Sequence, residues 1–317
     1  MIRLRVICPA ERTPGVLAVL RDDPGATHVV VLPGSAVEPE GDLVEADLAR
    51  EAVEGVLEQL RRVGVDRDGG IDLLGLDTVI STFADRAEEA APGEGADAIV
   101  WDELLARTGQ DARLTVTFTV MLTIACLLGA VGVVTDSPVT VVGAMVLGPE
   151  FGPLAALAVA IVRRRPRLAR EAATALVVGF AIALAITTAG AALGRLTGAV
   201  TDAALADLTQ TAFVFQVGPT NLLVALLAGV AGMVALLAGE GSGVLVGVFI
   251  SVTTVPAAGF AAVAAVLGAW SQALGSLAQL GINVVGIVVA GLVVLLVAGN
   301  RGRRVATRRR GRSSHAA

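Results

Sequence analysis

Long apolar segments dominate this chain from residue 116 onward. They are expected to form six transmembrane helices, at roughly 116–134, 139–162, 172–194, 221–238, 244–267 and 281–298. Each stretch has about the 20 apolar residues that an α-helix needs to cross the hydrocarbon core of a bilayer. Residues 199–218 are less apolar, and they are expected either to lie along the outer surface of the membrane or to cross the membrane. The sequence therefore predicts an α-helical polytopic membrane domain over residues 116–298.

The charge distribution divides the chain into two parts. Residues 1–113 contain 11 arginines and 23 acidic residues, a net charge of −12, whereas residues 114–317 contain 13 arginines and 6 acidic residues, a net charge of +7. Residues 1–30 do not have the order of charged and apolar regions of a signal peptide, so we expect an acidic cytosolic domain first. Nucleic acid is not an expected partner, because phosphate contacts require clustered arginine or lysine.

The composition argues against several kinds of chemistry. All 24 basic residues are arginine, so a phosphate-binding loop and a Schiff base, which both need lysine, are excluded. The two cysteines, Cys8 and Cys126, and the two histidines, His28 and His315, are isolated in the sequence and have no metal-ligand spacing. No nucleophile–base pair is evident. We therefore expect no enzymatic activity, no cofactor and no metal site.

The first 83 residues are predicted to form a ferredoxin-like α+β domain. Alternating or continuous apolar residues indicate four strands, and helical spacing with apolar residues on one face indicates two helices. The order βαββαβ is that of a ferredoxin-like sandwich, which can bind a small ligand or hold an oligomer together. The expected strands begin at Ile2, His28, Leu43 and Ile71, and the second one is expected to end at Pro33-Gly34.

Residues 84–115 are predicted to be a linker and an interfacial helix. The helix, 98–108, carries Trp101 as a membrane-surface anchor, although an ordinary surface helix fits equally well. Arginines are concentrated in the loop at 163–170 and in a basic tail at 299–317. The excess of arginine on cytoplasmic loops places both chain ends in the cytoplasm, in a bacterial inner (plasma) membrane.

The second apolar stretch contains an unusual hexapeptide, Gly148-Pro149-Glu150-Phe151-Gly152-Pro153. We expect it to interrupt the helix and to face a polar site; a plain proline kink is the alternative. A charged carboxylate at this depth costs on the order of 2.5–3.5 kcal/mol on insertion scales. Glu150 is therefore expected to be protonated, paired or hydrated, and to carry a proton or bind a cation. A neutral structural acid, or a span drawn in the wrong place, would also explain it.

The membrane half resembles itself after a shift of 104 residues. Asp136 then aligns with Glu240, and Gly152-Pro153 aligns with Pro256-Ala257. Three spans per copy require the second copy to insert with the opposite orientation, which predicts a 3+3 inverted repeat with broken helices. In such proteins broken helices at matching positions line the substrate site, so Thr253, Thr254, Val255 and Pro256 are the expected partner of the first break.

Several polar or helix-breaking residues are candidate site residues. We expect substrate or ion contacts from Gly148, Pro149, Glu150, Gly152, Pro153, Thr253, Thr254, Pro256 and Asn283. Other interpretations remain open: the threonines can bond freed carbonyls, and Asn221 and Asn283 can cap a helix or bond between helices. Asp136 and Glu240 lie at predicted turns, where capping is favoured over gating.

A family resemblance rests on the segment TDSPVTVVGAMVLGPEFGP, residues 135–153. It resembles the bacterial and archaeal membrane family called domain of unknown function 389, as do LLAGVAGMVALLAGEGSG, Val255-Pro256 and NVVGIVVAGLVV, which begins at Asn283. The resemblance covers about residues 100–298. The chain departs from the family pattern at Glu150-Phe151, where an apolar pair is expected. The resemblance implies a polytopic inner-membrane protein and brings no settled activity.

Two functions remain in competition. The first is a secondary transporter or ion-conducting protein for a small solute, which could be an anion. In this hypothesis the cytosolic domain of the protein senses a ligand or assembles an oligomer. The second is a membrane-anchored sensor or scaffold that transports nothing and binds a metabolite or nucleotide through residues 1–83. The abundant glycine and alanine of the spans allow close helix packing and a homo-oligomer. The expected partners are the lipid bilayer, a small solute or ion and a small cytosolic ligand.

Overall fold

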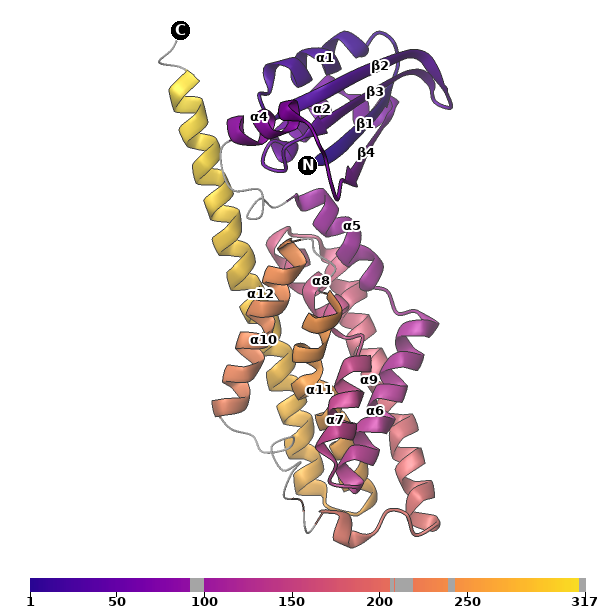
Figure 1. Ribbon diagram of the computed structural model, residues 1–317. Helices are drawn as coiled ribbons and strands as arrows, with labels where there is room; N and C mark the ends of the chain where they lie inside the picture. Colours follow the sequence, from indigo (N-terminus) through magenta and orange to yellow (C-terminus); the bar gives the residue numbers. More distant parts are fainter. Residues whose placement is uncertain (92–99, 206–207, 209–218, 239–242, 314–317) are drawn as a thin grey trace. The chain divides into compact units, whose positions relative to one another are not determined.

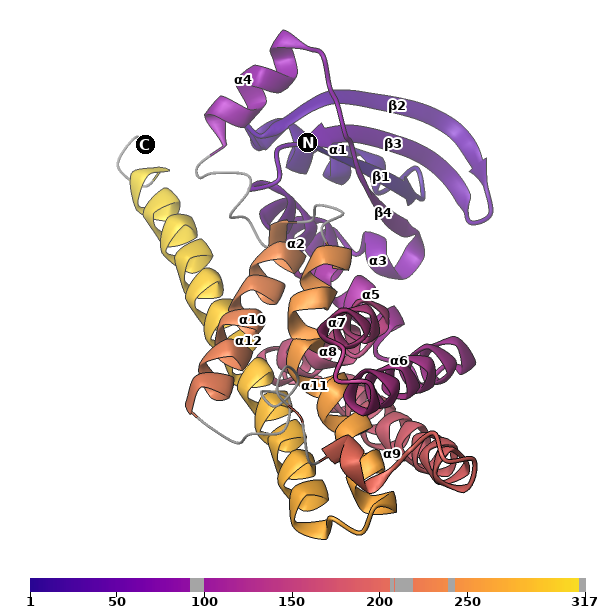
Figure 2. The same cartoon turned by 60° about the horizontal axis from the view of Figure 1, so that its bottom comes forward.

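The protein is described by a computed structural model over residues 1–91, 100–205, 208, 219–238 and 243–313, without the side chains of 219–220, 243–253 and 300–313. It forms two compact units (Figures 1 and 2), Met1–Leu104 with Ala298–Ala317, and Leu105–Val297. Glu240, the Thr253 side chain and most of residues 199–218 lie outside the described residues, so the predictions made for them stay predictions.

The N-terminal unit contains a four-stranded antiparallel sheet with the strand order β2-β3-β1-β4. The elements follow one another in the predicted order βαββαβ, with one extra short helix, α3, before the last strand. Their bounds are β1 Ile2–Cys8, α1 Thr13–Asp22, β2 Ala26–Val37, β3 Glu40–Leu48, α2 Val53–Val63, α3 Val65–Asp68 and β4 Gly70–Gly75.

The core of this unit lies between the sheet and the helices α1 and α2. Alternate residues of β1 are buried, as the apolar–polar alternation of its sequence predicts. The buried residues of α2 recur at helical spacing and form one face of the helix. They join the inward residues of β1 in a single cluster that includes Leu4, Val6, Val16, Val56, Leu57 and Leu60.

Strand β2 does not end at Pro33-Gly34, as the sequence predicted, but continues to Val37. Its pairing with β3 shifts register between Leu32 and Ala36, so the proline and glycine fall in an irregularity of the ladder. Gly34 has a φ of 58°, which suits glycine. Its N–H donates to the Asp42 carboxylate at 2.8 Å, and this bond replaces one that regular pairing would make.

The predicted linker is largely helical where it is described. Helix α4, Thr82–Ala90, occupies the start of the expected linker, and α5, Trp101–Asp111, matches the expected interfacial helix. The expected C-terminal tail is also helical up to Ser313, because α12 continues through it. The apolar stretch ends near residue 298, and this marks the end of the expected membrane segment. The helix itself can continue further, because its backbone hydrogen bonds form equally well outside the apolar stretch.

The second unit is a bundle of apolar helices. Within the described residues, four of its helices are long and apolar enough to cross a membrane. The number rises to five when α7 and α8, which are bent by 51° at their junction, are counted as one broken span. The bounds are α6 Val116–Val134, α7 Pro138–Leu147, α8 Phe151–Val162, α9 Pro166–Leu196, α10 Pro219–Ala238, α11 Gly243–Val266 and α12 Trp270–Ser313. This unit makes the chain a membrane protein.

The predicted interruption at Thr253–Pro256 is wrong. Helix α11 runs without a break from Gly243 to Val266, with Pro256 inside it. A proline is tolerated inside a membrane helix when neighbouring helices and side chains satisfy nearby backbone groups. Beside the proline, the Ser276 hydroxyl of α12 donates to the Ala257 carbonyl at 2.8 Å, and this bond joins α12 to α11. The part of α11 from Thr254 to Val266 is an apolar helix shorter than a span.

Helix α11 packs against α6, α7, α9 and α10, and it approaches α6 very closely. A Cβ atom on Gly259 would lie 2.6 Å from the backbone nitrogen of Ala130 and 2.8 Å from the carbonyl carbon of Gly129. On the facing helix, a Cβ on Gly129 would touch the Val255 carbonyl oxygen at 3.4 Å. Small residues at a helix crossing allow such backbone contact in membranes. Gly259 is thus required by packing.

Replacing Gly259 with alanine is expected to destabilise the membrane unit by about 1–3 kcal/mol, because the new methyl group would meet backbone atoms that cannot rotate away. Thermal unfolding of the detergent-purified protein measures the effect. Gly281→Ala on α12 is the matched control, since a Cβ there has no neighbour within 4 Å. Equal midpoints for Gly259→Ala and Gly281→Ala would contradict the close packing of α6 and α11.

Candidate functional site

The break between α7 and α8 is the most distinctive feature of the membrane unit. Helix α7 ends at Leu147, and Gly148 has an extended backbone with a ψ of 117°. A residue that precedes proline is pushed out of the helical region by the proline ring, so the sequence Gly148-Pro149 ends the helix. Helix α8 then starts at Phe151, with Glu150 at its N-cap position. The expected interruption at 148–150 is therefore present.

The Glu150 side chain is fully buried in this break, with an exposed fraction of 0%. Its Oε1 accepts a hydrogen bond from the Thr254 hydroxyl of α11 at 2.5 Å, and Thr254 is also 0% exposed. The position at the N-terminus of α8 favours a negative charge, because unpaired backbone N–H groups there give the helix end a partial positive charge. A proton donor from a second helix and a helix N-terminus thus converge on one buried carboxyl group.

Helix α12 carries a buried polar face. Ser276, Gln279 and Asn283 are at most 1% exposed, and their spacing of three and four residues places them on one side of the helix. Besides the bond of Ser276 to α11, the Gln279 amide Nε2 donates to Asn283 Oδ1 at 2.9 Å. No donor among the described residues reaches Gln279 Oε1, although that atom is buried. The face therefore holds an acceptor that can still take a hydrogen bond.

The polar face of α12 lies at the depth of the Glu150–Thr254 bond. Ser276 bonds Ala257, and Ala273 of α12 packs in one cluster with Phe260 of α11, so the two helices run antiparallel. Because both helices rise by about 1.5 Å per residue, three residues back from Ala257 correspond to three residues forward from Ser276. This correspondence brings Gln279 to the level of Thr254.

The other expected site residues are placed as follows. Pro149 lies in the break, Gly152 and Pro153 in the first turn of α8, and Pro256 inside α11, one turn or less from Thr254. A Cβ on Gly152 would lie 2.6 Å from the Cβ of Asp111, so packing of the α5 end explains the glycine. Burial raises the pKa of that aspartate.

Asp136 and Asn283 differ from expectation. Asp136 does not cap α7: the Ser137 hydroxyl does, by accepting from the Thr140 N–H at 3.3 Å, and Asp136 occupies a left-handed turn with a φ of 45°. Asn283 lies inside α12 rather than at its start, whereas Asn221 lies in the first turn of α10 and begins the apolar span, as expected. Asp136 is at the opposite end of α7 from Glu150, about 15 Å away by helix rise, so it does not join this site.

Sequence reasoning missed Ser276 and Gln279, because it began the sixth span at residue 281. A signal was present: Ser276, Gln279 and Asn283 are polar at helical spacing within the apolar stretch that α12 occupies. Polar residues on one face of a membrane helix usually face the bundle interior. The described part of the chain contains no group of three or more histidine, cysteine, aspartate or glutamate side chains that could hold a metal.

A second polar network lies in the N-terminal unit. Asp47, only 2% exposed, accepts hydrogen bonds from Arg3 Nε at 2.9 Å and from Arg3 Nη2 at 3.2 Å. It also pairs with His28 Nδ1 at 2.9 Å, and His28 Nε2 contacts the Ser81 hydroxyl at 2.8 Å. Ser81 is the N-cap of α4 and accepts from the Phe83 N–H at 3.2 Å. His28 has a left-handed φ of 49°.

This network contains a nucleophile–base contact that the sequence did not indicate. The order serine, histidine, aspartate also occurs in acyl-transfer enzymes. Here, however, Arg3 already neutralises Asp47, which reduces the ability of the carboxylate to stabilise an imidazolium ion. The bonds connect β1, β2, β3 and the start of α4, so they hold that helix on the sheet. The absence of enzymatic activity stays a prediction.

Two aspartates of this unit have lowered pKa values. Burial of Asp47 opposes ionisation, but the hydrogen bonds from Arg3 and His28 outweigh it and hold the pKa of Asp47 below its ordinary value. The Thr13 hydroxyl, which donates to Asp42 at 2.6 Å, lowers the pKa of Asp42, helped by the Gly34 N–H. Both groups stabilise the folded unit in their charged forms.

A segment of the membrane unit is similar to a family whose description assigns no activity. Residues 145–289 match the family described as Domain of unknown function (DUF389), which confirms the resemblance over the segment that contains Glu150, Thr254 and Asn283. No curated protein matches the chain, and no solved structure matches it either.

Thr254→Val is expected to destabilise the membrane unit by about 1–3 kcal/mol, because it removes the hydroxyl that bonds the buried Glu150 carboxyl while preserving the side-chain shape. The measurement is thermal unfolding of the detergent-purified protein. Thr254→Ser keeps the hydroxyl and is the matched control. If the valine variant unfolds at the temperature of the serine variant, the hydrogen bond does not contribute to stability.

Acid is expected to destabilise the N-terminal unit through Asp47. Because its pKa is lowered on folding, its contribution is fully present above the unfolded-state pKa of about 3.9 and is lost as pH falls through the lower native pKa. Asp47→Asn should cost about 1.5–3 kcal/mol at pH 7 and flatten this dependence. Hydrogen exchange of β1 and β3 peptides, corrected for the effect of pH on the intrinsic exchange rate, measures the loss of stability in Asp47→Asn and the pH dependence of stability.

Asp72→Asn on β4 is the control for this experiment, because Asp72 is an exposed acid of the same sheet. It should leave the exchange of β1 and β3 unchanged. If Asp47→Asn exchanges as slowly as the wild type at pH 7, the hydrogen bonds of Asp47 do not stabilise the N-terminal unit.

Proposed function

We propose that this chain is a secondary transporter or ion-conducting membrane protein for a small solute, including an anionic one, and that Glu150 carries a proton during transport. The observation that carries the proposal is the fully buried Glu150 carboxyl group, held in a helix break by the Thr254 hydroxyl. A carboxyl group inside an apolar bundle costs several kcal/mol when it is charged and unpaired, and ionisable residues at such positions commonly serve proton or ion pathways.

The local chemistry supports a group that changes its protonation state. The helix N-terminus and the Thr254 hydroxyl stabilise the ionised form of Glu150, and apolar burial stabilises the neutral form. Opposing effects of this kind allow a carboxyl group to release and rebind a proton. Gln279 Oε1 lies at the same level and has no donor among the described residues, so a solute that donates a hydrogen bond has an acceptor there.

An inverted repeat would explain why Glu150 and Thr254 meet. They are 104 residues apart, which is the shift that aligns the two membrane halves, so they are equivalent positions of the two copies. In two copies related by a two-fold axis, residues on that axis contact their own equivalents. A contact between equivalents is therefore expected at the interface of the two halves, where transporters with inverted repeats bind their substrates.

Helix packing also supports two related copies. In the first half, Gly179 of α9 packs on Phe118 and Leu122 of α6. In the second half, Gly286 of α12 packs on Leu222 and Ala225 of α10. Gly286 lies about one helical turn after Asn283, the residue that the 104-residue shift aligns with Gly179. In both halves the third helix rests on the first through a glycine. Helix α11, with 24 residues, is long enough to complete six spans.

The proposal includes an orientation and a role for the N-terminal unit. Arginines 163, 164, 165, 167 and 170 follow α8, and the arginines of the C-terminal tail follow the α12 membrane segment. With six spans both groups face the cytoplasm of a bacterial inner membrane. The N-terminal unit then senses a small cytosolic ligand or holds a homo-oligomer together. A sensor that transports nothing is the competing outcome of the test.

Glu150→Gln is expected to abolish proton movement, because an amide cannot release a proton but keeps the size of the side chain. The full-length protein in liposomes, loaded with a pH-sensitive dye, is given an inward proton gradient or a potassium diffusion potential. Inorganic phosphate, sulfate and small carboxylates are then added singly. Wild-type protein should acidify the lumen faster than protein-free liposomes, and Glu150→Gln should not.

Asp202→Asn is the matched control, since Asp202 is a highly exposed acid of the same unit. It should behave as the wild type. Wild-type liposomes without flux under every condition would favour the sensor or scaffold. Equal flux for wild type and Glu150→Gln would preserve transport but remove Glu150 as the proton carrier.

A further inference from the structure

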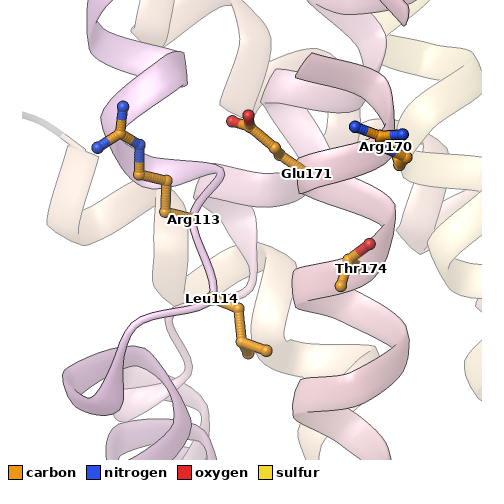
Figure 3. A pocket seen from close by; sticks show the side chains of 5 residues that line it. All are labelled: Arg113, Leu114, Arg170, Glu171 and Thr174. Atoms are coloured by element: carbon orange, nitrogen blue, oxygen red, sulfur yellow. The ribbon is translucent and has the colours of Figure 1, made fainter. Parts of the chain in front are cut away.

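An open pocket lies in the membrane unit between the segment before α6 and the start of α9 (Figure 3). It is lined by Arg113, Leu114, Arg170, Glu171 and Thr174. Arg113 and Leu114 immediately precede Thr115, the N-cap of α6, and the other three belong to the first turns of α9. The Glu171 side chain points into the space between α9 and the 113–114 segment. The proposed transport site does not include any of these residues.

The charges of this pocket are exposed and have no partner within the described chain. Arg113, Arg170 and Glu171 are all exposed. Among the described residues, none of the three forms an ion pair or a side-chain hydrogen bond. In the N-terminal unit, by contrast, Arg3, Arg12, Arg50, Arg61 and Arg62 all pair with acids. The pocket therefore presents two guanidinium groups and one carboxylate that can be satisfied by a ligand.

The position of the pocket along the helices corresponds to the surface of the bilayer. Helix α6 is apolar from Val116 onward, directly after the pocket residues. Helix α9 has its last charged residue before the apolar stretch at Glu171, and the next one, Arg195, comes near its end. Two helices thus change from charged to apolar at the level of the pocket. Phospholipid headgroups occupy this level in a membrane, and basic pockets between membrane helices bind them.

We propose that this pocket binds the headgroup of a zwitterionic phospholipid, phosphatidylethanolamine. The guanidinium groups of Arg113 and Arg170 attract the lipid phosphate and donate hydrogen bonds to it. The lipid ammonium group pairs with the Glu171 carboxylate. The Thr174 hydroxyl donates to a lipid oxygen, and Leu114 contacts the start of an acyl chain.

The carboxylate of Glu171 decides the choice of lipid. Two arginines alone would favour a purely anionic headgroup such as phosphatidylglycerol. A carboxylate beside them repels a second negative oxygen and attracts a cation, since unlike charges attract and like charges repel over a few ångströms. Phosphatidylethanolamine has one phosphate and one ammonium group, and these match the arginines and the glutamate in sign.

Native mass spectrometry of the full-length protein in detergent tests the proposal, with phosphatidylethanolamine and phosphatidylglycerol added separately. Wild-type protein should retain phosphatidylethanolamine more strongly. Arg113→Ala with Arg170→Ala should reduce its retention by roughly tenfold or more, at about 1 kcal/mol for each arginine near the membrane surface. Glu171→Gln should reduce retention of phosphatidylethanolamine and leave that of phosphatidylglycerol unchanged or raised.

The matched control is Arg165→Ala with Arg167→Ala, which removes the same charge from the same side of the unit without touching the pocket. It should bind phosphatidylethanolamine as the wild type does. If the Arg113/Arg170 double variant does not elute as a single folded species, Glu171→Gln alone decides the question. Equal retention of both lipids by the wild type and by Glu171→Gln overturns the proposal, and so does full retention of phosphatidylethanolamine by a folded double variant.

Discussion

A hydrogen bond between two fully buried side chains, Glu150 and Thr254, joins the start of α8 to α11 in the membrane unit. Both side chains are buried away from water, so the carboxyl group depends on polar groups of the protein. This need fixes the positions of two elements at once: α8 has to begin where its N-terminus meets the carboxyl group, and α11 has to present Thr254 toward the break. The helix break and the helix crossing are thus parts of one arrangement.

Close helix packing makes that arrangement possible. The backbones of α6 and α11 meet at Gly129 and Gly259, because neither residue has a side chain to separate them. Lipid tails are as apolar as leucine, so van der Waals packing and interhelical hydrogen bonds, rather than the hydrophobic effect, hold such helices together. The glycines therefore allow α11 to approach the elements around the break.

The N-terminal unit satisfies its buried charge in a different way. Asp47 lies in the sheet and forms ion pairs with Arg3 and His28, whereas the bond described for Glu150 comes from an uncharged hydroxyl group. Such a carboxylate stays ionised and stabilises the fold, whereas the carboxyl group in the membrane unit has neighbours that favour both of its protonation states. This contrast is the reason for proposing a structural role for Asp47 and a proton-carrying role for Glu150.

The sequence by itself determined the elements whose formation depends on local composition. The apolar runs gave the membrane helices to within a few residues for α6 and α10, the alternating pattern gave the strands, and Gly148-Pro149 gave the break. Pro256 did not break α11, because the tolerance of a proline in a membrane helix depends on packing against helices that are distant in the sequence. The internal repeat had paired the segment of Glu150 with that of Thr254, but only the tertiary structure could decide that these two side chains form a hydrogen bond, that Gln279 lies at their level, and that Ser81 meets His28. These contacts join segments separated by tens of residues, and helix packing and sheet pairing set the distances between them.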